Sequence, residues 1–326
     1  MTPVEERLKR RIAAERSISV ADYMAEANAH YYAGRDPLGI AGDFITAPEI
    51  SQMFGELIGI WCADLWQRAG EPATARYVEL GPGRGTLAED ALRAMRGAGL
   101  APPVELVETS PKLRAAQAER VSARWHDDLS TIPENGPLLV VANEFFDALP
   151  VRQYEGEREL RIGYGLGGEP GFVRDGPVET EASPASLQIV TDLARRLAAQ
   201  GGAALIVDYG HDRPGTGDTL QAVSGHAYAD PFEAPGERDL TAHVDFHALA
   251  SAARAAGVRI FGPAPQGAWL NAMGIKLRAA SLAKAAPERG TEIAAARARL
   301  TAPDQMGRLF KVMALVAPGW PEPGGF

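Results

Sequence analysis

A glycine-rich turn between an apolar run and a helical run most constrains what this chain can fold into. The run Tyr77-Val-Glu-Leu80 ends beside three alternate glycines, Gly81, Gly83 and Gly85, and a helix-forming segment begins at Leu87. Glycines at these positions let the backbone turn sharply and approach a ligand without a Cβ atom in the way. A strand, such a turn and a helix in this order belong at the carboxyl edge of a parallel sheet, where α/β proteins bind their ligands.

The spacing of the glycines separates two classes of cofactor. A dinucleotide site requires G-x-G-x-x-G, but Thr86 stands where the third glycine would fall, and glycine comes one residue earlier. The G-x-G-x-G form preceded by Glu79 resembles the first motif of S-adenosylmethionine-dependent methyltransferases. Their cofactor carries a cationic sulfonium and an ammonium, so the acidic Glu79 fits it better than it fits a pyrophosphate. The alternative is a βα turn with only a structural role.

A second apolar run supports a nucleoside-containing cofactor. Val104-Glu-Leu-Val-Glu108 reads as a buried strand that ends in an acid. Glu108 lies close to the roughly 20-residue offset from the glycine turn at which an acidic side chain receives the ribose hydroxyls. We therefore predict Glu108 as the ribose ligand, the alternative being a surface glutamate at the end of a strand.

Later apolar runs repeat the pattern of a strand that stops at a polar residue. Residues 137–142 lead into Asn143, and residues 202–207 lead into Asp208. Four such runs, mostly separated by helical stretches, predict an α/β fold with a doubly wound, mostly parallel sheet.

The remaining cofactor contacts are expected from residues near the ends of these strands. Asp127 and Asp128 follow the third sequential strand, where a contact to the adenine amine is expected, and we group Leu129 with them. Asn143 is a candidate for the methionine end of the cofactor. Thr46, in a turn-rich segment ahead of the first sheet strand, is also predicted to bind the cofactor. The sequence predicts no metal site.

The charge and hydropathy of the chain limit the classes of partner that it can bind. The formal net charge is -9, which argues against nucleic acid or an anionic membrane as the main partner and favours cationic substrates. Apolar runs do not approach the 18 residues needed to span a bilayer, and the N-terminus lacks a secretory hydrophobic core. We therefore expect a cytoplasmic protein without integral membrane contact.

Longer motifs carry a more specific resemblance. The chain closely resembles the MidA-like methyltransferases, the family of the mitochondrial complex I assembly factor that methylates an arginine. One departure is Ala47, where the family commonly has serine. The motifs that carry the resemblance are Arg35-Asp-Pro-Leu-Gly, the segment 42–56, Glu79-Leu-Gly-Pro-Gly-Arg-Gly-Thr-Leu, Val107-Glu-Thr-Ser-Pro, Ala142-Asn-Glu-Phe-Phe-Asp-Ala-Leu-Pro, Val207-Asp-Tyr-Gly-His, Gly217-Asp-Thr-Leu-Gln, the segment 239–246 and Met306-Gly-Arg-Leu-Phe-Lys-Val.

This resemblance implies a class I, Rossmann-like methyltransferase fold that uses S-adenosyl-L-methionine. It also implies protein arginine methylation, with a respiratory complex I subunit or a similar protein as partner, and a mitochondrial matrix location in the eukaryotic relatives. We expect an N-terminal helical region with a cofactor-capping loop over 1–72 and a methyltransferase domain over 73–326. Insertions are expected near 151–184, 212–243 and 263–305.

Arginine methylation needs carboxylates that hold a cationic guanidinium and accept the proton lost after transfer. Glu144 and Asp147 follow the strand 137–142 and lie three residues apart, on one face if a helical turn begins there. They are the first candidates for an arginine clamp, and Glu49 is the third. The alternative is that the pair caps a helix N-terminus.

Three hypotheses of function follow. The leading one is an S-adenosylmethionine-dependent protein arginine methyltransferase. The second is a methyltransferase that acts on a small molecule. The third is an assembly chaperone that keeps the cofactor pocket but acts by binding a partner subunit, and only methylation of the partner separates it from the first.

Overall fold

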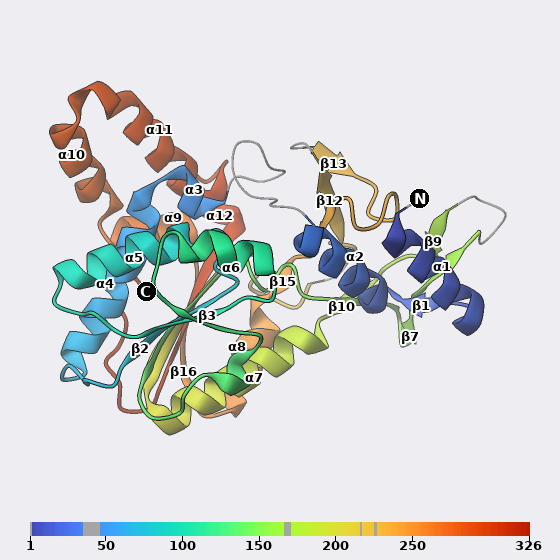
Figure 1. Ribbon diagram of the computed structural model, residues 1–326, viewed down its shortest axis with the longest axis horizontal. Helices are drawn as coiled ribbons and strands as arrows, with labels where there is room; N and C mark the ends of the chain where they lie inside the picture. Colours follow the sequence, from blue (N-terminus) through green and yellow to red (C-terminus); the bar gives the residue numbers. More distant parts are fainter. Residues whose placement is uncertain (1, 35–45, 166–170, 216, 225–226) are drawn as a thin grey trace. The chain divides into compact units, whose positions relative to one another are not determined.

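The computed structural model describes residues 2–34, 46–165, 171–215, 217–224 and 227–326. The motif at 35–39 and part of the predicted cofactor-capping loop, up to residue 45, lie outside the described residues. The chain divides into two compact units, which are drawn in Figure 1. Unit 1 consists of Met1–Phe44, Phe146–Ile189 and His211–Leu249, and unit 2 consists of Ile45–Phe145, Val190–Gly210 and Ala250–Phe326.

Unit 2 is built on one sheet. Its strands are β2 (Arg76–Leu80), β3 (Val104–Val107), β4 (Arg124–His126), β5 (Leu138–Asn143), β11 (Gly202–His211), β16 (Arg259–Pro265) and β17 (Phe310–Val316). They follow the order β16-β17-β11-β5-β2-β3-β4. Along this order the pairs from β11 to β4 are parallel, and β17 runs antiparallel to both β11 and β16. The predicted doubly wound, mostly parallel sheet is confirmed.

Helices cover both faces of this sheet because alternate side chains of its strands point to opposite faces and are apolar. Figure 1 shows α4 (Gln52–Arg68) and α5 (Thr86–Gly97) on one face, and α7 (Pro184–Gln200) and α8 (Phe246–Ala255) on the other. Leu139 of β5 belongs to the same buried cluster as side chains of α4 and α5. Burying one aliphatic side chain of this size contributes roughly 1.5–3 kcal/mol.

Helix α4 packs against α5 at unusually short range. A Cβ atom on Gly55 would lie 2.7 Å from the Cβ atom of Asp90, and one on Gly59 would lie 2.3 Å from the carbonyl oxygen of Ala91. Because its apolar side chains also join the core of unit 2, α4 belongs with the sheet. The division after residue 44 therefore differs from the boundary after residue 72 that we expected from sequence.

The rest of unit 2 consists of short helices and a helical hairpin. Helices α10 and α11 form the hairpin, which Figure 1 shows in red-brown, within the expected insertion at 263–305. Arg278 of α10 donates to Glu56 of α4 at 2.7 Å, which ties the hairpin to the sheet-covering helices. The bounds are α3 (Ala47–Ile50), α6 (Pro111–Ala118), η1 (Leu129–Thr131), α9 (Gln266–Ala272), α10 (Ile275–Ala285), η3 (Pro287–Arg289), α11 (Gly290–Thr301) and α12 (Met306–Leu309).

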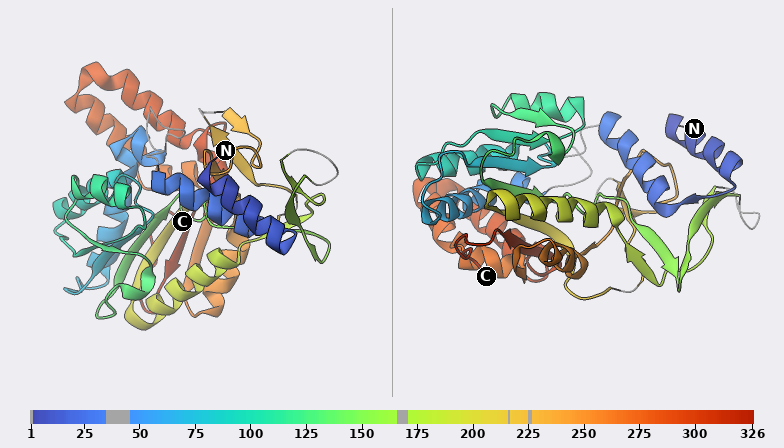
Figure 2. Two further views of the ribbon diagram at one scale, coloured as in Figure 1. Left: turned by 45° about the vertical axis from the view of Figure 1, so that its right-hand side comes forward. Right: turned by 90° about the horizontal axis from the view of Figure 1, so that it is seen from below.

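Unit 1 combines two helices with small antiparallel sheets. Its elements are α1 (Pro3–Glu15), β1 (Ile18–Ser19), α2 (Val20–Gly34), β6 (Arg152–Glu155), β7 (Arg158–Glu159), β8 (Arg161–Tyr164), β9 (Phe172–Arg174), β10 (Thr180–Ala182), β12 (Gln221–Ser224), β13 (Ala227–Ala229), β14 (Asp239–Thr241) and β15 (Val244–Asp245). Figure 2 shows α1 and α2 near β8 and β9. Ile18 pairs with Ile162, and Asn28 hydrogen-bonds both the N–H and the carbonyl of Leu240. Distant parts of the sequence thus form one core.

Candidate active site

The glycine turn connects β2 to α5 as the spacing predicts. Gly81, Gly83 and Gly85 have φ angles of 61°, 54° and 83°, in the left-handed region that glycine adopts without a Cβ clash. The N–H of Gly85 donates to the carbonyl of Pro82 at 2.8 Å. A Cβ atom on Gly81 would lie 2.9 Å from Cδ2 of Phe145. The turn therefore depends on glycine, and it lies at the carboxyl end of β2.

Glu79 is a buried acid beside this turn. Its side chain is almost inaccessible, with 2% of the residue exposed, and the hydroxyl of Tyr77 donates to its Oε2 at 2.5 Å. Burial raises the pKa of the Glu79 carboxyl to about 8, and the Tyr77 hydrogen bond acts in the opposite direction. The carboxyl is thus protonated at neutral pH unless a cation approaches it.

Glu108 follows β3 and lies at the same edge of the sheet. Its Oε1 accepts the N–H of Ser110 at 2.7 Å. Burial raises the pKa of Glu108, while hydrogen bonds from Ser110, Thr109 and Gln117 lower it. Gln117 of α6 also donates to the carbonyl of Gly83 at 2.7 Å. The side chain of Gln117 therefore links the predicted ribose ligand to the glycine turn. No sequence signal indicates this role, since a glutamine within an ordinary helix has no distinctive pattern.

The predicted adenine contacts follow β4. Asp127 is mostly exposed and accepts Arg114 at 2.6 Å, while the same guanidinium donates to the carbonyl of Glu108 at 2.6 Å. Asp128 accepts the N–H of Ser130 at 2.7 Å and so caps η1, which begins at Leu129. Arg114 thus holds the segment after β4 against the segment after β3.

Asn143 and Glu144 end β5 beside the start of α3. Asn143 Nδ2 donates to Oε1 of Glu144 at 3.2 Å, and the N–H of Ala47 donates to the same oxygen at 3.3 Å. Oδ1 of Asn143 is buried and receives no hydrogen bond from the part of the chain that the structure describes. Glu144 itself has a φ of 49°, which is uncommon for a residue other than glycine.

Glu49 lies on α3 and reaches the residue that follows the glycine turn. Its Oε1 accepts the hydroxyl of Thr86 at 2.6 Å. Thr46 is the N-cap residue of α3; its carbonyl accepts the N–H of Glu49, but its side chain makes no capping hydrogen bond. Helix α3 therefore contacts Thr86 through the side chain of Glu49, and it contacts Glu144 through the N–H of Ala47.

The helical turn that we expected to begin at Glu144 is absent from the described segment 144–150. The chain forms bends and a turn there, and the positive φ of Glu144 is incompatible with the first turn of a helix. The expected helical face and its helix-cap alternative are therefore both wrong. Asp147 belongs to unit 1, where its carbonyl accepts the N–H of Ala242 at 2.9 Å. Its pairing with Glu144 stays a prediction.

Comparison with protein families identifies the kind of enzyme to which this site belongs. Residues 57–172 and 170–264 match the sequence profile of a family described as "Putative S-adenosyl-L-methionine-dependent methyltransferase". The chain belongs to this family.

Relatives of this methyltransferase match it along nearly its whole length. It is 38% identical to the Drosophila melanogaster "Protein arginine methyltransferase NDUFAF7 homolog, mitochondrial", over 94% of this chain and 83% of the relative. It is 35% identical to the Homo sapiens "Protein arginine methyltransferase NDUFAF7, mitochondrial", over 97% of this chain and 84% of the relative. A crystal structure of a "likely methyl transferase from Burkholderia thailandensis bound to S-adenosyl-homocysteine" matches with a TM-score of 0.84 at 28% identity and covers 96% of this chain and 91% of that chain.

S-adenosyl-L-methionine is the cofactor of this methyltransferase. The residues at the carboxyl edge fit it: the buried Oδ1 of Asn143 is an acceptor that lacks a donor among the described residues, which suits an ammonium group. The glycine turn offers backbone without side chains, and Glu79 offers a carboxyl whose ionised form a nearby cation would stabilise. None of the helices in the described ranges combines the length and the hydrophobicity needed to cross a bilayer.

Proposed function

We propose that this enzyme transfers a methyl group from S-adenosyl-L-methionine to an arginine side chain of a protein partner. The proposal is supported by the relatives named as protein arginine methyltransferases, two of which match more than four fifths of their own length at 35% to 38% identity. The observation that carries it on this chain is the arrangement of α3, which hydrogen-bonds Glu144 and Thr86 through Ala47 and Glu49. Glu49 thus reaches the residue after the glycine turn, and Glu144 hydrogen-bonds the first residue of the same short helix.

Different residues would hold different parts of the cofactor. Glu108 would receive the ribose hydroxyls, and Asp127, Asp128 and Leu129 would surround the adenine. Gln117, which hydrogen-bonds the carbonyl of Gly83, positions the turn against Glu108.

The methionine end of the cofactor would lie near Glu79 and Asn143. Glu79 and the buried Oδ1 of Asn143, which accepts no hydrogen bond from the described residues, suit the cationic ammonium. The backbone of Gly81, Gly83 and Gly85 would meet the body of the cofactor, and Thr46 would contact it from the start of α3.

Carboxylates have two tasks in this reaction. A guanidinium is cationic in water and must present one nitrogen in line with the methyl group. Glu144, with Glu49 and Asp147, would hold the guanidinium by bidentate hydrogen bonds and orient that nitrogen. When bound, S-adenosyl-L-methionine would supply an electrophilic methyl group, and the nitrogen–carbon bond would form as the carbon–sulfur bond breaks. The proton that the methylated nitrogen loses passes to a carboxylate oxygen, for which Glu144 is the first candidate.

The partner is expected to be a protein that presents an accessible arginine, with a respiratory complex I subunit as the first candidate because of the names of the relatives. The formal charge of -9 is compatible with a cationic target segment. We also propose a cytoplasmic location for the protein.

A methyl-transfer assay on captured partners tests the proposal. Tagged enzyme is used to isolate bound proteins, which are then incubated with enzyme and S-adenosylmethionine carrying a deuterated methyl group. Mass spectrometry of the proteins should find the heavy methyl group on arginine, and the Glu144→Gln enzyme should leave it almost absent. Label found only on a small molecule would replace the proposal with the second hypothesis. Stable partner binding without any label would replace it with the chaperone hypothesis.

A further inference from the structure

A cavity lies in unit 2 beside α5. Its volume is about 330 Å³, and its lining comes from α5 and from the segments that lead into β3 and β4. Val104 is the first residue of β3, and Ser122 precedes β4, so this part of the lining lies at the amino ends of these strands. Glu108 and the three glycines of the turn do not line the cavity, although the N–H of Glu89, which does, donates to the carbonyl of Gly85 at 2.9 Å.

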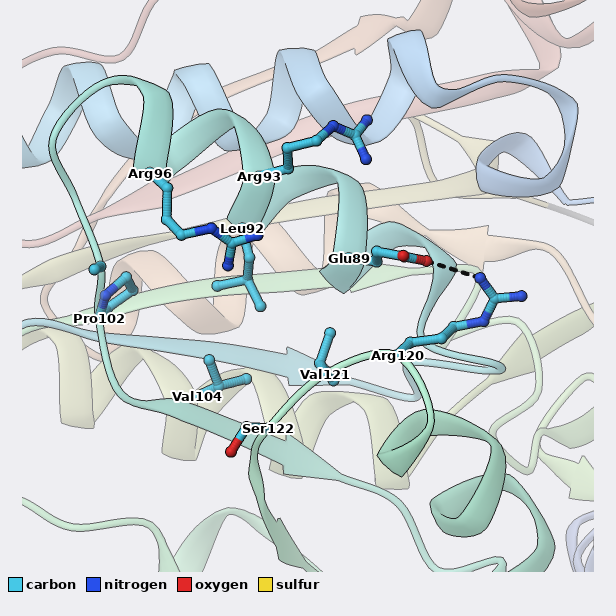
Figure 3. A pocket seen from close by; sticks show the side chains of 10 residues that line it. Glu89, Leu92, Arg93, Arg96, Pro102, Val104, Arg120, Val121 and Ser122 are labelled. Carbon is cyan, nitrogen blue, oxygen red and sulfur yellow. Dashed lines mark hydrogen bonds and ion pairs between the residues drawn. The ribbon is translucent and has the colours of Figure 1, made fainter.

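The charges around the cavity are mainly positive. Arg93, Arg96 and Arg120 line it together with one acid, Glu89, as Figure 3 shows. Nη1 of Arg120 forms an ion pair with Oε2 of Glu89 at 2.7 Å. A positive lining on a chain whose formal charge is -9 would attract an anion locally.

The three guanidinium groups are not equivalent. Arg93 is neutralised by Asp90 at 2.6 Å and Glu56 at 3.0 Å. Arg96, in the last turn of α5, has an exposed side chain that makes no ion pair or hydrogen bond within the described ranges of the chain. Its guanidinium therefore retains its donors for a carboxylate or phosphate oxygen, which it can bind bidentately.

The floor of the cavity is apolar. Leu92 and Val121 are 5% and 8% exposed, and Pro102 and Val104 complete this surface. A volume of about 330 Å³ lies at the lower end of the range of small-molecule sites. A small apolar group placed on this floor would lose water contact while a neighbouring oxyanion meets Arg96.

We propose that this cavity is a binding site for a small amphipathic anion, with a carboxylate or phosphate-monoester head at Arg96 and a short apolar body over Leu92 and Val121. The site is independent of the proposed methyl transfer. Because α5 begins at the glycine turn and carries Leu92 and Arg96 in its later turns, the ligand would contact the helix that follows the cofactor loop.

Calorimetry with a set of matched probes tests this site. Hexyl phosphate and hexanoate carry the two possible heads on one apolar body, hexanol lacks the charge, and inorganic phosphate lacks the body. Hexyl phosphate or hexanoate should bind, and the tighter of the two identifies the head group. Hexanol and inorganic phosphate should each bind at least about tenfold more weakly, because each lacks one of the two contacts.

Variants locate the binding. Arg96→Gln should weaken the better probe by about tenfold or more, the loss expected for one charge-assisted interaction. Arg299→Gln removes the same charge from an exposed position of α11 and should leave the affinity unchanged. Val104→Thr keeps the shape of the floor but makes it polar. It should weaken binding of the probes with an apolar body and leave binding of inorganic phosphate unchanged. Equal binding by wild type and Arg96→Gln, or no binding of either anionic probe, would overturn the proposal, and S-adenosylmethionine binding measured alongside confirms that each variant is folded.

Discussion

Tyr77 donates a hydrogen bond of 2.5 Å to Glu79, two residues further along the same buried strand. The contact places a neutral donor beside a carboxyl whose pKa burial raises to about 8. The hydroxyl stabilises the ionised form, but its effect is smaller than that of burial. The carboxyl beside the glycine turn is therefore mostly protonated near neutral pH.

The raised pKa of Glu79 predicts a loss of stability with rising pH. The unfolded chain releases this proton near the ordinary value of 4.5, whereas the folded chain keeps it up to about pH 8. The free energy of unfolding should therefore fall across this interval by at most about 1.4 kcal/mol per pH unit. Urea unfolding of wild type and Glu79→Gln across the interval measures the difference. Tyr77→Phe should extend the fall to higher pH, and identical slopes in wild type and Glu79→Gln would contradict the assignment.

Glu108→Ala should weaken S-adenosylmethionine binding by roughly 1.5–3 kcal/mol, the contribution of a hydrogen bond to a charged group. Isothermal titration calorimetry provides the measurement, and the demethylated product should respond in the same way. Glu119→Ala, at the exposed end of α6, is the control. NAD should give no heat of binding. Tight NAD binding, or an unchanged affinity of Glu108→Ala, would show that this acid does not hold the ribose.

Gly83→Ala should lower cofactor affinity by at least about tenfold because its methyl group would stand where the backbone meets the ligand. Gly99→Ala is a matched control: its φ is 89°, and nothing lies within 4 Å of the added Cβ atom. Both substitutions should cost roughly 1–2 kcal/mol of stability through the left-handed backbone. Thermal unfolding measures that shared cost, and calorimetry measures the affinity. A normal affinity in folded Gly83→Ala would remove the turn from the binding site.

Glu144→Gln and Asp147→Asn should each cut methyl transfer about 100-fold or more, the scale of a lost general base. The amides keep the size of the side chains, so cofactor affinity should stay within a few-fold. Single-turnover transfer to the captured partner, with cofactor binding measured in parallel, distinguishes the two effects. Full transfer by both variants would assign the proton to another acceptor, with Glu49 as the next to test.

The middle of the central sheet was predictable because β2, β3, β5 and β11 each carry a local signal. An apolar run that stops at Asn143 or Glu108 identifies both the strand and the edge where ligands bind, and the parallel order follows from the intervening helices. The glycine turn was predictable for the same reason: three glycines and their conformation lie within five residues.

Contacts between distant segments were not predictable from local patterns. Nothing near Ile18 indicates a pairing with Ile162, and nothing near Asn28 indicates Leu240, so the organisation of unit 1 required the structure. The helical turn considered at Glu144 was wrong for another reason: an acidic residue after a strand favours a helix start, but here the backbone adopts a positive φ. A side chain such as Gln117 gains its role only from the groups that surround it.

The position of β17 has a consequence for synthesis on the ribosome. This strand comes last along the chain, yet it lies inside the sheet and pairs with β11 on one side and β16 on the other. A nascent chain that has not yet emerged to Val316 leaves the long edge of β11 exposed, and such edges recruit other chains. Truncation before Phe310 would therefore leave an aggregating fragment, because the sheet closes only when β17 enters between β11 and β16.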